Sequence, residues 1–502
     1  MSAHDSDYQR VEVDHFGPIA KADIDLRPLT VLVGASGSGK SYLAKLLYAL
    51  HRYFSLHLAF KHRSWKTTRF YELARETPDL LGVVEQFEKW LADESSSSGV
   101  PCPPEVFPLA RESVKGVDTG TALEAELRRI FGVETIQPLI LRTRASADIR
   151  LDHSPLGASA YPPAFRYVFK LNDGKLEWQL DVEDDAPVRL ERSGTFWQRG
   201  LVPNFFQRRR PEQSIDGSPI NPAALQHVLA DLAQPSTVGP FSRAAHYLPA
   251  SRSGGMETQQ LLLRGSLRDM TTAGRRQESA APPLSGVLAD YIEGILIDLP
   301  AKPTDWGEGD RLAREVEQTI LGGSVRVEKP ENGSPRVLFR PAGWEEDLPL
   351  ARASSMVTEM IPVAVYLRHQ VQAGETIIIE EPEAHMHPEM QVRLGAALAK
   401  IVAAGIRVII TVHSDWILSA LANICRMAEL PDEDRGDMAG GDVTLPASQI
   451  GVWELVPNER GETETREIVL DSDNGMFDAG YPRIAQALYD DWATIHSRLQ
   501  ED

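Results

Sequence analysis

The sequence predicts an α/β fold, in which a mixed sheet with flanking helices carries a large mixed α+β insertion. A short strand pattern over residues 29–33 opens directly into a glycine-rich loop and then into a helical pattern. A second strand pattern, 376–379, runs into the adjacent carboxylates Glu380 and Glu381. Because burying an unpartnered charge is costly, and because ligands bind at the carboxyl edge of parallel strands, we expect a functional site at that edge.

The composition is that of an ordinary folded protein. The chain has 502 residues, of which 42% are hydrophobic and 25% charged, and its length allows about two to four domains. The formal net charge of −20 argues against a general electrostatic nucleic-acid binder, so any DNA contact would come from a local basic patch. The two cysteines, Cys102 and Cys425, predict neither a disulfide framework nor a cysteine zinc site. The N-terminus has no basic and apolar leader pattern, and no apolar run approaches the roughly 18 residues of a membrane span, so we expect a cytoplasmic protein without a membrane partner.

The glycine-rich loop has the full G-x-x-x-x-G-K-S pattern of a P-loop, between a strand and a helix. Its candidate nucleotide-binding residues are Gly34, Ala35, Ser36, Gly37, Ser38, Gly39, Lys40 and Ser41. The glycines allow backbone N–H groups to face phosphates at a helix N-terminus, while Lys40 supplies charge to the β- and γ-phosphates and Ser41 supplies a hydroxyl to Mg²⁺. The alternative is a chance glycine-rich turn, which the strand–loop–helix context disfavours.

The two carboxylates after the 376–379 strand pattern have two interpretations. They could supply a metal-water ligand and a general base to a nucleotide site, or they could form a solvated acidic turn after an ordinary core strand. The stretch alone does not decide, but the P-loop favours the first interpretation. Another buried strand pattern, 408–410, is soon followed by His413, which is well placed to sense a γ-phosphate; the alternative is a structural histidine.

Two further positions keep both a structural and a functional interpretation. Ser354 or Ser355 can cap the helical pattern over 356–370, or the N-terminus of that helix can face an anion. Arg252 lies on a glycine-containing turn after a strand pattern at 247–250. It could reach a phosphate or be a surface loop charge, and the sequence does not separate these two roles.

The signals divide the chain into three parts. Residues 1–54 and 244–502 hold the P-loop and the carboxylate strands, and residues 55–243 form a mixed helical and β-hairpin insertion. Within the insertion, Asn172-Asp173-Gly174 predicts a hairpin turn. An acidic cluster also lies there, with Asp181, Glu183, Asp184 and Asp185. It could bind a metal for nuclease chemistry, although a solvated charge run at the end of a hairpin is the better interpretation.

The order of the segments resembles a known family. Lys40 and Glu380 are 380 − 40 = 340 residues apart, whereas kinase-like and AAA+-like chains complete both segments within one compact domain. The segments that carry the resemblance are the P-loop, Ala353-Ser354-Ser355, residues 377–388 (Ile-Ile-Ile-Glu-Glu-Pro-Glu-Ala-His-Met-His-Pro) and Thr411-Val412-His413-Ser414. Together they resemble the ABC/SMC-related P-loop ATPases of the OLD/RecF-like group, which is similar to the AAA-type ATPases of anti-phage defence systems. The resemblance covers both ends of the chain and not its middle.

The resemblance implies an ABC-type ATPase head that binds ATP and Mg²⁺. Such heads work as dimers, in which the signature helix of one copy completes the ATP site of the other. On this basis Glu381 is the catalytic base and His413 the switch histidine. Glu380 and Ser41 hold the metal, and Ser354 or Ser355 contacts the nucleotide of the second copy.

The sequence departs from the family pattern in several places. The signature serine is normally followed by glycine, but this chain has Ser354-Ser355-Met356, and no glutamine is assigned to the Q-loop. The sequence shows no Toprim nuclease domain like that of OLD proteins, no long coiled-coil heptads and no zinc hook. Residues 383–387 match the D-loop, so we reject a metal-hydrolase ligand set for His385 and His387.

These patterns predict a cytoplasmic ATPase whose nucleotide-driven assembly into a homodimer or higher oligomer controls a partner. The expected partner is a separately encoded effector, a nuclease or toxin-like protein, in anti-phage defence or DNA metabolism. Two alternatives remain. One is a self-contained metal-dependent nuclease with its site in the insertion, and the other is an ATPase that binds or loads DNA ends.

Overall fold

The computed structural model describes much of both ends of the chain and parts of its middle. The described residues are 8–58, 100–101, 120–153, 165–172, 174–182, 189–193, 196–198, 241, 243–254, 285–296, 307–328, 336–436, 438, 440–470, 475, 477, 486–493 and 496. The chain forms two compact units. The first comprises Met1–Gly17, Ala49–Arg128 and Val133–Ala244, and the second comprises Pro18–Tyr48, Arg129–Gly132 and Ala245–Asp502. The division into 1–54, 55–243 and 244–502 remains a prediction from the sequence.

The second unit is built on a mixed sheet with the strand order β10-β14-β15-β3-β16-β17-β2. Its strands are β2 (Ile19–Leu26), β3 (Leu29–Gly34), β10 (Ala245–Leu248), β14 (Thr376–Glu380), β15 (Arg407–Val412), β16 (Ile450–Pro457) and β17 (Thr463–Glu467). The strands from β10 to β16 run parallel, β17 is antiparallel to β16, and β2 is parallel to β17. The predicted α/β fold with a mixed sheet and flanking helices is confirmed.

The central strands of this sheet have continuous apolar sequences because they are buried. Every residue of β14 is buried, and β15 and β3 each have a single partly exposed residue, at one end. Strands buried on both faces need no alternation of polar and apolar side chains. The side chains on one face of these strands, such as Val31, Ile377 and Ile410, join those of neighbouring helices in an apolar core.

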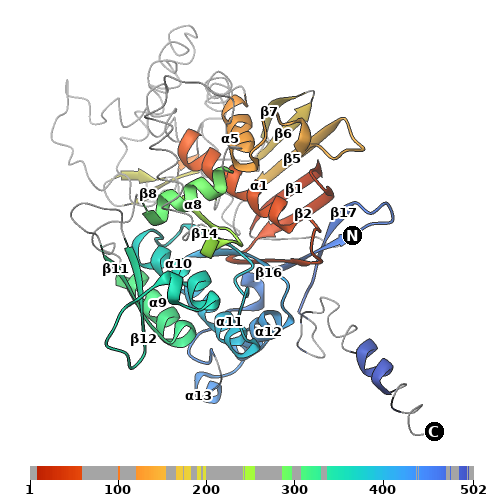
Figure 1. Ribbon diagram of the computed structural model, residues 1–502. Coiled ribbons are helices and arrows are strands. Elements are labelled where there is room, and N and C mark those ends of the chain that lie inside the picture. Colours follow the sequence, from red (N-terminus) through yellow and green to blue (C-terminus); the bar gives the residue numbers. More distant parts are fainter. Residues whose placement is uncertain are drawn as a thin grey trace, which may run out of the picture. The chain divides into compact units, whose positions relative to one another are not determined.

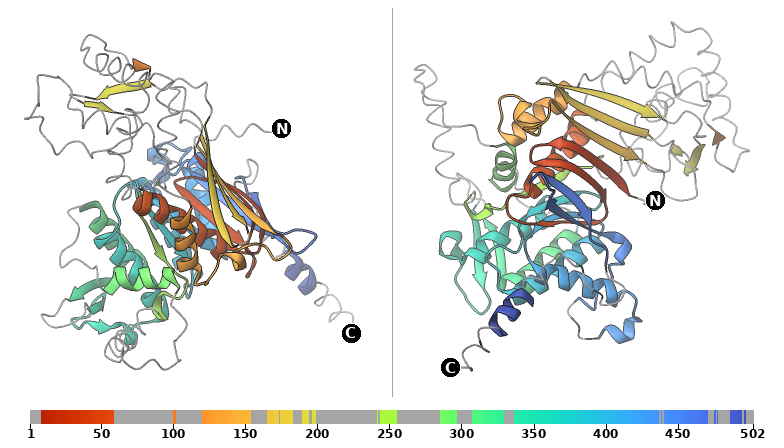
Figure 2. Two further views of the ribbon diagram at one scale, coloured as in Figure 1. Left: turned by 90° about the horizontal axis from the view of Figure 1, so that it is seen from above. Right: turned by 90° about the vertical axis from the view of Figure 1, so that its right-hand side faces the viewer.

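The helices that contribute side chains to this core are α8 (Gly286–Leu296), α9 (Gly307–Val316), α10 (Ser355–His369), α11 (Pro388–Ala403) and α12 (Asp415–Met427). The second unit also contains α1 (Lys40–Arg52, whose last residues belong to the first unit) and α13 (Asp432–Arg435). Helix α9 packs on α10 and α11 packs on α12, and Figures 1 and 2 show these four helices gathered together. The hydroxyls of Ser354 and Ser414 cap α10 and α12 by accepting backbone N–H groups of the first turn.

A small antiparallel sheet also belongs to the second unit. Its strands are β11 (Gly323–Glu328), β12 (Arg336–Pro341) and β13 (Leu348–Pro349). The helical run that begins with α9 continues through a π-helical segment, Glu317–Leu321, and ends at Gly322, whose φ of 64° gives a left-handed C-cap. A 3₁₀ turn at Leu350–Arg352 then leads from β13 to α10.

The first unit contains an antiparallel sheet. Its strands are β1 (Gln9–Phe16), β5 (Ser146–His153), β6 (Phe165–Asn172) and β7 (Lys175–Val182), and its helix α5 spans Thr121–Phe131, the last three residues of which belong to the second unit. The short strands β4 (Val100–Pro101), β8 (Arg189–Ser193) and β9 (Phe196–Gln198) pair separately. Strands β6 and β7 pair up to Asn172 and Lys175, which confirms the hairpin predicted there. Asp181 lies in β7, but Glu183, Asp184 and Asp185 lie outside the described residues.

Near the C-terminus, residues 486–493 are helical. Three large side chains of this segment, Leu488, Tyr489 and Trp492, are exposed, and the rings of Tyr489 and Trp492 lie 5.8 Å apart. Among the described residues, no helix is both long enough and apolar enough to cross a bilayer.

Candidate functional site

The P-loop connects the end of β3 to the start of α1 and needs glycine at its turns. Gly34, Gly37 and Gly39 have φ values of 139°, 79° and 97°, which side chains rarely allow. A Cβ atom on Gly34 would lie 2.5 Å from the carbonyl oxygen of Leu455 in β16. The loop therefore depends on glycine both for its backbone conformation and for its close approach to the neighbouring strand.

Lys40 lies inside the loop and not in solvent. Its Nζ donates hydrogen bonds to the carbonyl oxygens of Gly34 and Ala35, both at 2.8 Å, and the residue is only 5% exposed. Burial lowers the pKa of Lys40, and the negative charges of Glu381 and Glu383 oppose this change. The ammonium group is thus held among loop carbonyls, where a phosphate oxygen could replace them as its partner.

Three strand ends meet at one edge of the sheet. Strands β3, β15 and β14 are parallel neighbours, with Val33 opposite Val412 and Thr411 opposite Glu380. The P-loop, the segment at His413 and the two carboxylates therefore follow adjacent strands. This is the edge at which open α/β sheets bind their ligands.

Glu380 ends β14 and is 5% exposed. Its Oε2 accepts a hydrogen bond from the backbone N–H of Ala250 at 3.2 Å. Burial raises the pKa of the nearby Tyr247 hydroxyl and Glu380 adds to this, but Oε1 of Glu380 is buried and meets no donor with hydrogen-bond geometry among the described residues. A buried carboxylate oxygen without a donor is costly, and oxygen atoms are the ligands that Mg²⁺ prefers. The donor set of Glu380 and the exposed hydroxyl of Ser41 therefore fits a Mg²⁺ ion, and this assignment remains a prediction.

Glu381 has an unusual backbone conformation, with a φ of 44°. Its N–H donates to the carbonyl oxygen of Thr411 at 2.9 Å and to the Thr411 hydroxyl at 3.1 Å. The carboxylate remains 42% exposed and lies 3.5 Å from Nε2 of His413. A left-handed non-glycine residue of this kind costs about 1–3 kcal/mol and often marks a functional position.

Glu383 links the turn after β14 to His413, a contact that the sequence analysis missed. Its Oε1 accepts the backbone N–H of His413, and its Oε2 is buried without a hydrogen-bond partner among the described residues. Burial raises the pKa of Glu383, hydrogen bonds from backbone N–H groups oppose this, and the charge of Glu381 adds to it. Burial also lowers the pKa of the His413 imidazole; Lys40 lowers it further and Glu381 opposes.

The raised pKa of Glu383 predicts a pH-dependent stability. Because the folded-state pKa lies above the unfolded value near 4.5, the folded protein holds a proton that the unfolded chain has released, and stability falls as the pH rises through the folded pKa. Glu383→Gln removes this ionisation but keeps an acceptor for His413. We therefore expect the Tm of Glu383→Gln, relative to wild type, to increase as the pH rises above the unfolded value near 4.5.

Thermal unfolding of both proteins across this pH range measures the effect. Glu389→Gln, at an exposed position on α11, is the matched control and should show no such trend. A constant difference in Tm between Glu383→Gln and wild type at every pH would show that Glu383 does not titrate in this way.

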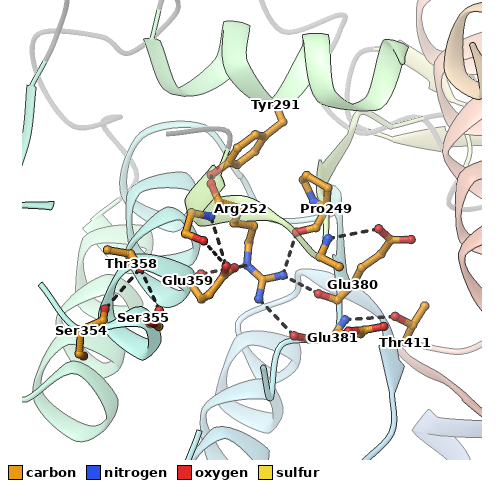
Figure 3. A network of polar contacts seen from close by, with 12 residues as sticks. Pro249, Arg252, Tyr291, Ser354, Ser355, Thr358, Glu359, Glu380, Glu381 and Thr411 are labelled. Atoms are coloured by element: carbon orange, nitrogen blue, oxygen red, sulfur yellow. Dashed lines mark hydrogen bonds and ion pairs between the residues drawn. The ribbon is translucent and has the colours of Figure 1, made fainter. Parts of the chain in front are cut away.

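Arg252 has neither of the roles considered from the sequence. It is not a surface charge, because it is fully buried, and its guanidinium is occupied by protein groups rather than open to a phosphate. Nη1 donates to the carbonyl oxygens of Pro249 and Glu380, and Nη2 donates to that of Glu381 at 3.2 Å. Figure 3 shows this guanidinium among the peptide groups at the end of β14.

The other side of the Arg252 guanidinium faces α10. Its Nε donates to the carbonyl oxygen of Glu359 at 2.9 Å and lies 3.3 Å from Oε2 of the same residue, whose side chain is 3% exposed. Glu359 also accepts hydrogen bonds from the N–H and hydroxyl of Ser253, and Tyr291 donates to the carbonyl oxygen of Arg252. Burial lowers the pKa of Arg252 and the charge of Glu359 opposes this. The pair is a buried ion pair inside a hydrogen-bond network (Figure 3).

This burial predicts a large stability effect. Arg252→Met leaves Glu359 as an uncompensated buried charge, so we expect the free energy of unfolding to fall by about 3–5 kcal/mol. The double variant Arg252→Met/Glu359→Met should recover much of this loss, because it removes both charges. Urea unfolding measures the free energy of unfolding of the single and the double variant. Arg311→Met, which breaks an exposed pair with Glu308, should change stability by less than about 1 kcal/mol; an equally small effect at Arg252 would contradict the prediction.

The two serines before α10 occupy an exposed helix N-terminus. Ser354 is the N-cap, and its hydroxyl accepts the backbone N–H of Val357 at 3.4 Å. Ser355 is the first residue of the helix, and its carbonyl oxygen accepts the Thr358 hydroxyl at 2.9 Å. The structural capping role is thus observed for Ser354, and the nucleotide contact of either serine remains a prediction.

The two histidines of the D-loop, His385 and His387, lie directly before α11. His385 has a φ of 63°, and His387 is the N-cap of α11, where its Nδ1 accepts the backbone N–H of Glu389 at 3.4 Å. In the part of the chain that the structure describes, no group of three or more His, Cys, Asp or Glu side chains is arranged to hold a metal ion.

Comparison with known families identifies one part of the chain. Residues 309–418 match the family model described as an AAA ATPase domain. This range runs from α9 into α12 and contains Glu380, Glu381 and His413, while the P-loop lies outside it. This part of the chain is therefore similar to an AAA ATPase domain. No curated protein sequence matches the chain.

Solved structures similar to the chain include Smc head domains. The SmcHead bound to the C-winged helix domain of ScpA is 12% identical, with 92% of this chain and 98% of that chain covered and a TM-score of 0.38. The Smc head with an extended coiled coil, bound to the C-terminal domain of ScpA and derived from Pyrococcus furiosus, is 11% identical, with 92% and 96% covered and a TM-score of 0.39. The SMC head domain from Thermotoga maritima is 10% identical, with 92% and 98% covered and a TM-score of 0.34.

Proposed function

We propose that this chain is a Mg²⁺-dependent ATPase of the OLD/RecF-like group, whose ATP-bound form dimerises and thereby controls a separately encoded effector. One observation carries the proposal. Lys40, Glu381 and His413 follow three adjacent parallel strands and are close enough for their charges to act on one another. The match to the AAA ATPase domain model supports the proposal, because the matched residues include Glu381 and His413, which would act on the attacking water and the γ-phosphate.

The geometry assigns a separate task to each group. The P-loop binds the phosphates, with Lys40 exchanging loop carbonyls for phosphate oxygens. Glu381, with its exposed carboxylate at the sheet edge, orients and deprotonates the attacking water. His413, 3.5 Å from that carboxylate, senses the γ-phosphate as a mostly neutral imidazole. Ser41 and Glu380 would hold Mg²⁺, which neutralises charge on the phosphates.

Dimerisation is the proposed consequence of ATP binding. The start of α10 presents two exposed serines at a helix N-terminus, where an anion is favoured. A phosphate bound to a second copy of the chain can approach this end of the helix. Hydrolysis would then remove the γ-phosphate, and the two copies would separate. The rate of hydrolysis would therefore set the lifetime of the dimer.

The effector and the cellular setting rest on the resemblance of the motifs. ATPases of this kind in anti-phage systems act with a separate nuclease or toxin-like protein, so we propose a cytoplasmic complex of this type. Co-expression with the product of the neighbouring gene tests the partner directly. We expect the amount of complex to differ between ATP and ADP. An equal amount of complex with either nucleotide would contradict the proposed switch.

Phosphate release and light scattering test the ATPase itself. We expect wild-type protein to hydrolyse ATP only with Mg²⁺ and to double its mass in solution with Mg²⁺ and a slowly hydrolysed ATP analogue, but not with ADP. An absence of hydrolysis together with a mass that does not change would overturn the proposal.

Plasmid incubated with the protein, ATP, and Mg²⁺ or Mn²⁺ tests the other functions. Cleavage by the lone protein that is lost in Asp184→Ala/Asp185→Ala but kept in Lys40→Ala would replace the partner model with a self-contained nuclease. Preferential binding of linear over circular DNA, together with DNA-stimulated ATP hydrolysis, would favour the DNA-end loader.

A further inference from the structure

The peptide of Glu381 is held from both sides. Its N–H donates to the carbonyl and hydroxyl oxygens of Thr411, and its carbonyl oxygen accepts a hydrogen bond from Nη2 of Arg252 at 3.2 Å. Between these contacts the residue keeps a φ of 44°. A strained conformation persists only where its surroundings over-determine it, and these contacts supply that constraint.

Arg252 is in turn fixed by α10 and β14. Its Nε contacts the carbonyl and carboxylate oxygens of Glu359, and its Nη1 contacts the carbonyl oxygens of Pro249 and Glu380. Glu359 lies 359 − 355 = 4 residues into α10, one turn from the exposed start of that helix. The guanidinium therefore connects the first turns of α10 to the peptide of Glu381 (Figure 3).

We propose that Arg252 is a positioning residue for ATP hydrolysis: it holds the Glu381 peptide in its left-handed conformation and so aims the carboxylate at the attacking water. This inference rests on the proposed function. Arg252 cannot itself be a phosphate ligand in this conformation, because it is fully buried and its contacts are with protein groups. It acts through Glu381.

The proposal predicts that lysine cannot replace Arg252. A planar guanidinium donates in several fixed directions at once, whereas an ammonium is a compact charge on a flexible stem. Arg252→Lys keeps the charge beside Glu359 but cannot reach both Glu359 and the carbonyl oxygen of Glu381 with the same geometry. A displacement of about 1 Å in a catalytic group can lower a rate about 10²-fold.

Steady-state hydrolysis and ATP binding are measured for Arg252→Lys and wild type. We expect kcat to fall by about 10²-fold, while the Kd for a fluorescent ATP analogue stays close to the wild-type value. Thr411→Val, with Thr411→Ser as its comparison, tests the other side of the same peptide without touching the buried ion pair. Valine removes the hydroxyl acceptor and serine keeps it, so kcat should be lower for valine.

A double-variant cycle separates positioning from general stability. In a Glu381→Gln background the group that Arg252 aims is no longer a base, so Arg252→Lys should lower the residual rate only slightly further. A residue that merely stabilises the fold would lower the rate by the same factor in both backgrounds.

The outcomes distinguish this inference from the proposed function. A wild-type protein without ATP hydrolysis overturns both. Wild-type hydrolysis combined with an unchanged kcat in Arg252→Lys, or with equal factors in the two backgrounds, overturns the positioning role alone. If Arg252→Lys fails to fold, equal kcat values for Thr411→Val and Thr411→Ser overturn it.

Discussion

Glu381→Gln is expected to lower the rate of ATP hydrolysis by about 10²–10⁴-fold while leaving ATP binding intact, because general-base catalysis typically contributes a factor of this size. The substitution keeps the shape of the side chain and its hydrogen bonding but removes the base. The side chain of Glu381 is 42% exposed, and Lys40 is held by the carbonyl oxygens of Gly34 and Ala35, so the phosphate-binding groups should stay in place. The variant should therefore accumulate the ATP-bound dimer or a higher assembly.

Single-turnover phosphate release measures the rate of hydrolysis, and light scattering with Mg²⁺-ATP measures the assembly. Glu389→Gln is the control, since the side chain of Glu389 is 62% exposed and, among the described residues, pairs with Arg393 on the same helix. It should hydrolyse ATP as the wild type does. Wild-type hydrolysis by Glu381→Gln, or an assembly that ignores ATP, would show that the chemistry lies elsewhere.

Lys40→Ala should fail one step earlier, at nucleotide binding. The variant loses a charge-assisted hydrogen bond to phosphate, worth about 1.5–3 kcal/mol, which corresponds to about a 10- to 150-fold weaker Kd. It also leaves the carbonyl oxygens of Gly34 and Ala35 without their Nζ donor, so the loop itself should loosen. At an ATP concentration that assembles Glu381→Gln, Lys40→Ala should remain in its apo state.

Titration of a fluorescent ATP analogue measures this Kd, and light scattering measures the assembly. Lys45→Ala, five residues further along α1 (45 − 40 = 5), removes the same charge without touching the loop and should bind as the wild type does. Equal affinities for Lys40→Ala and Lys45→Ala would mean that the loop does not bind the phosphates.

Much of this architecture could be predicted from local patterns in the sequence. The P-loop is a contiguous motif between a strand and a helix, and the β6–β7 hairpin is set by three consecutive turn residues. The shared edge of β3, β14 and β15 is consistent with a general property of parallel sheets, whose ligands bind at the carboxyl ends of the strands. The P-loop begins at the end of β3, Glu380 ends β14, and His413 directly follows β15.

The contacts between distant segments could not be predicted in the same way. The sequence does not decide whether Arg252 is a phosphate ligand or a surface charge, because its burial depends on contacts with α10 and β14, which are more than a hundred residues away. The sequence places Glu383 only in the D-loop pattern, whereas in the structure its carboxylate accepts the backbone N–H of His413. In both cases the sequence gives the residue type, while the partner is decided by tertiary packing.

The position of β3 has a consequence for how the protein is made. Among the described strands, β3 pairs with β15 and β16, and the paired residues Val33 and Val412 are 412 − 33 = 379 positions apart. At a synthesis rate of about 5–20 residues per second, the strand that carries the P-loop waits on the order of 20–80 seconds for its first neighbour. The carbonyl of Leu455 that packs against Gly34 emerges later still. A ribosome-bound chain halted just before β16 would contain every nucleotide motif but would lack one of the two strands that flank the P-loop strand.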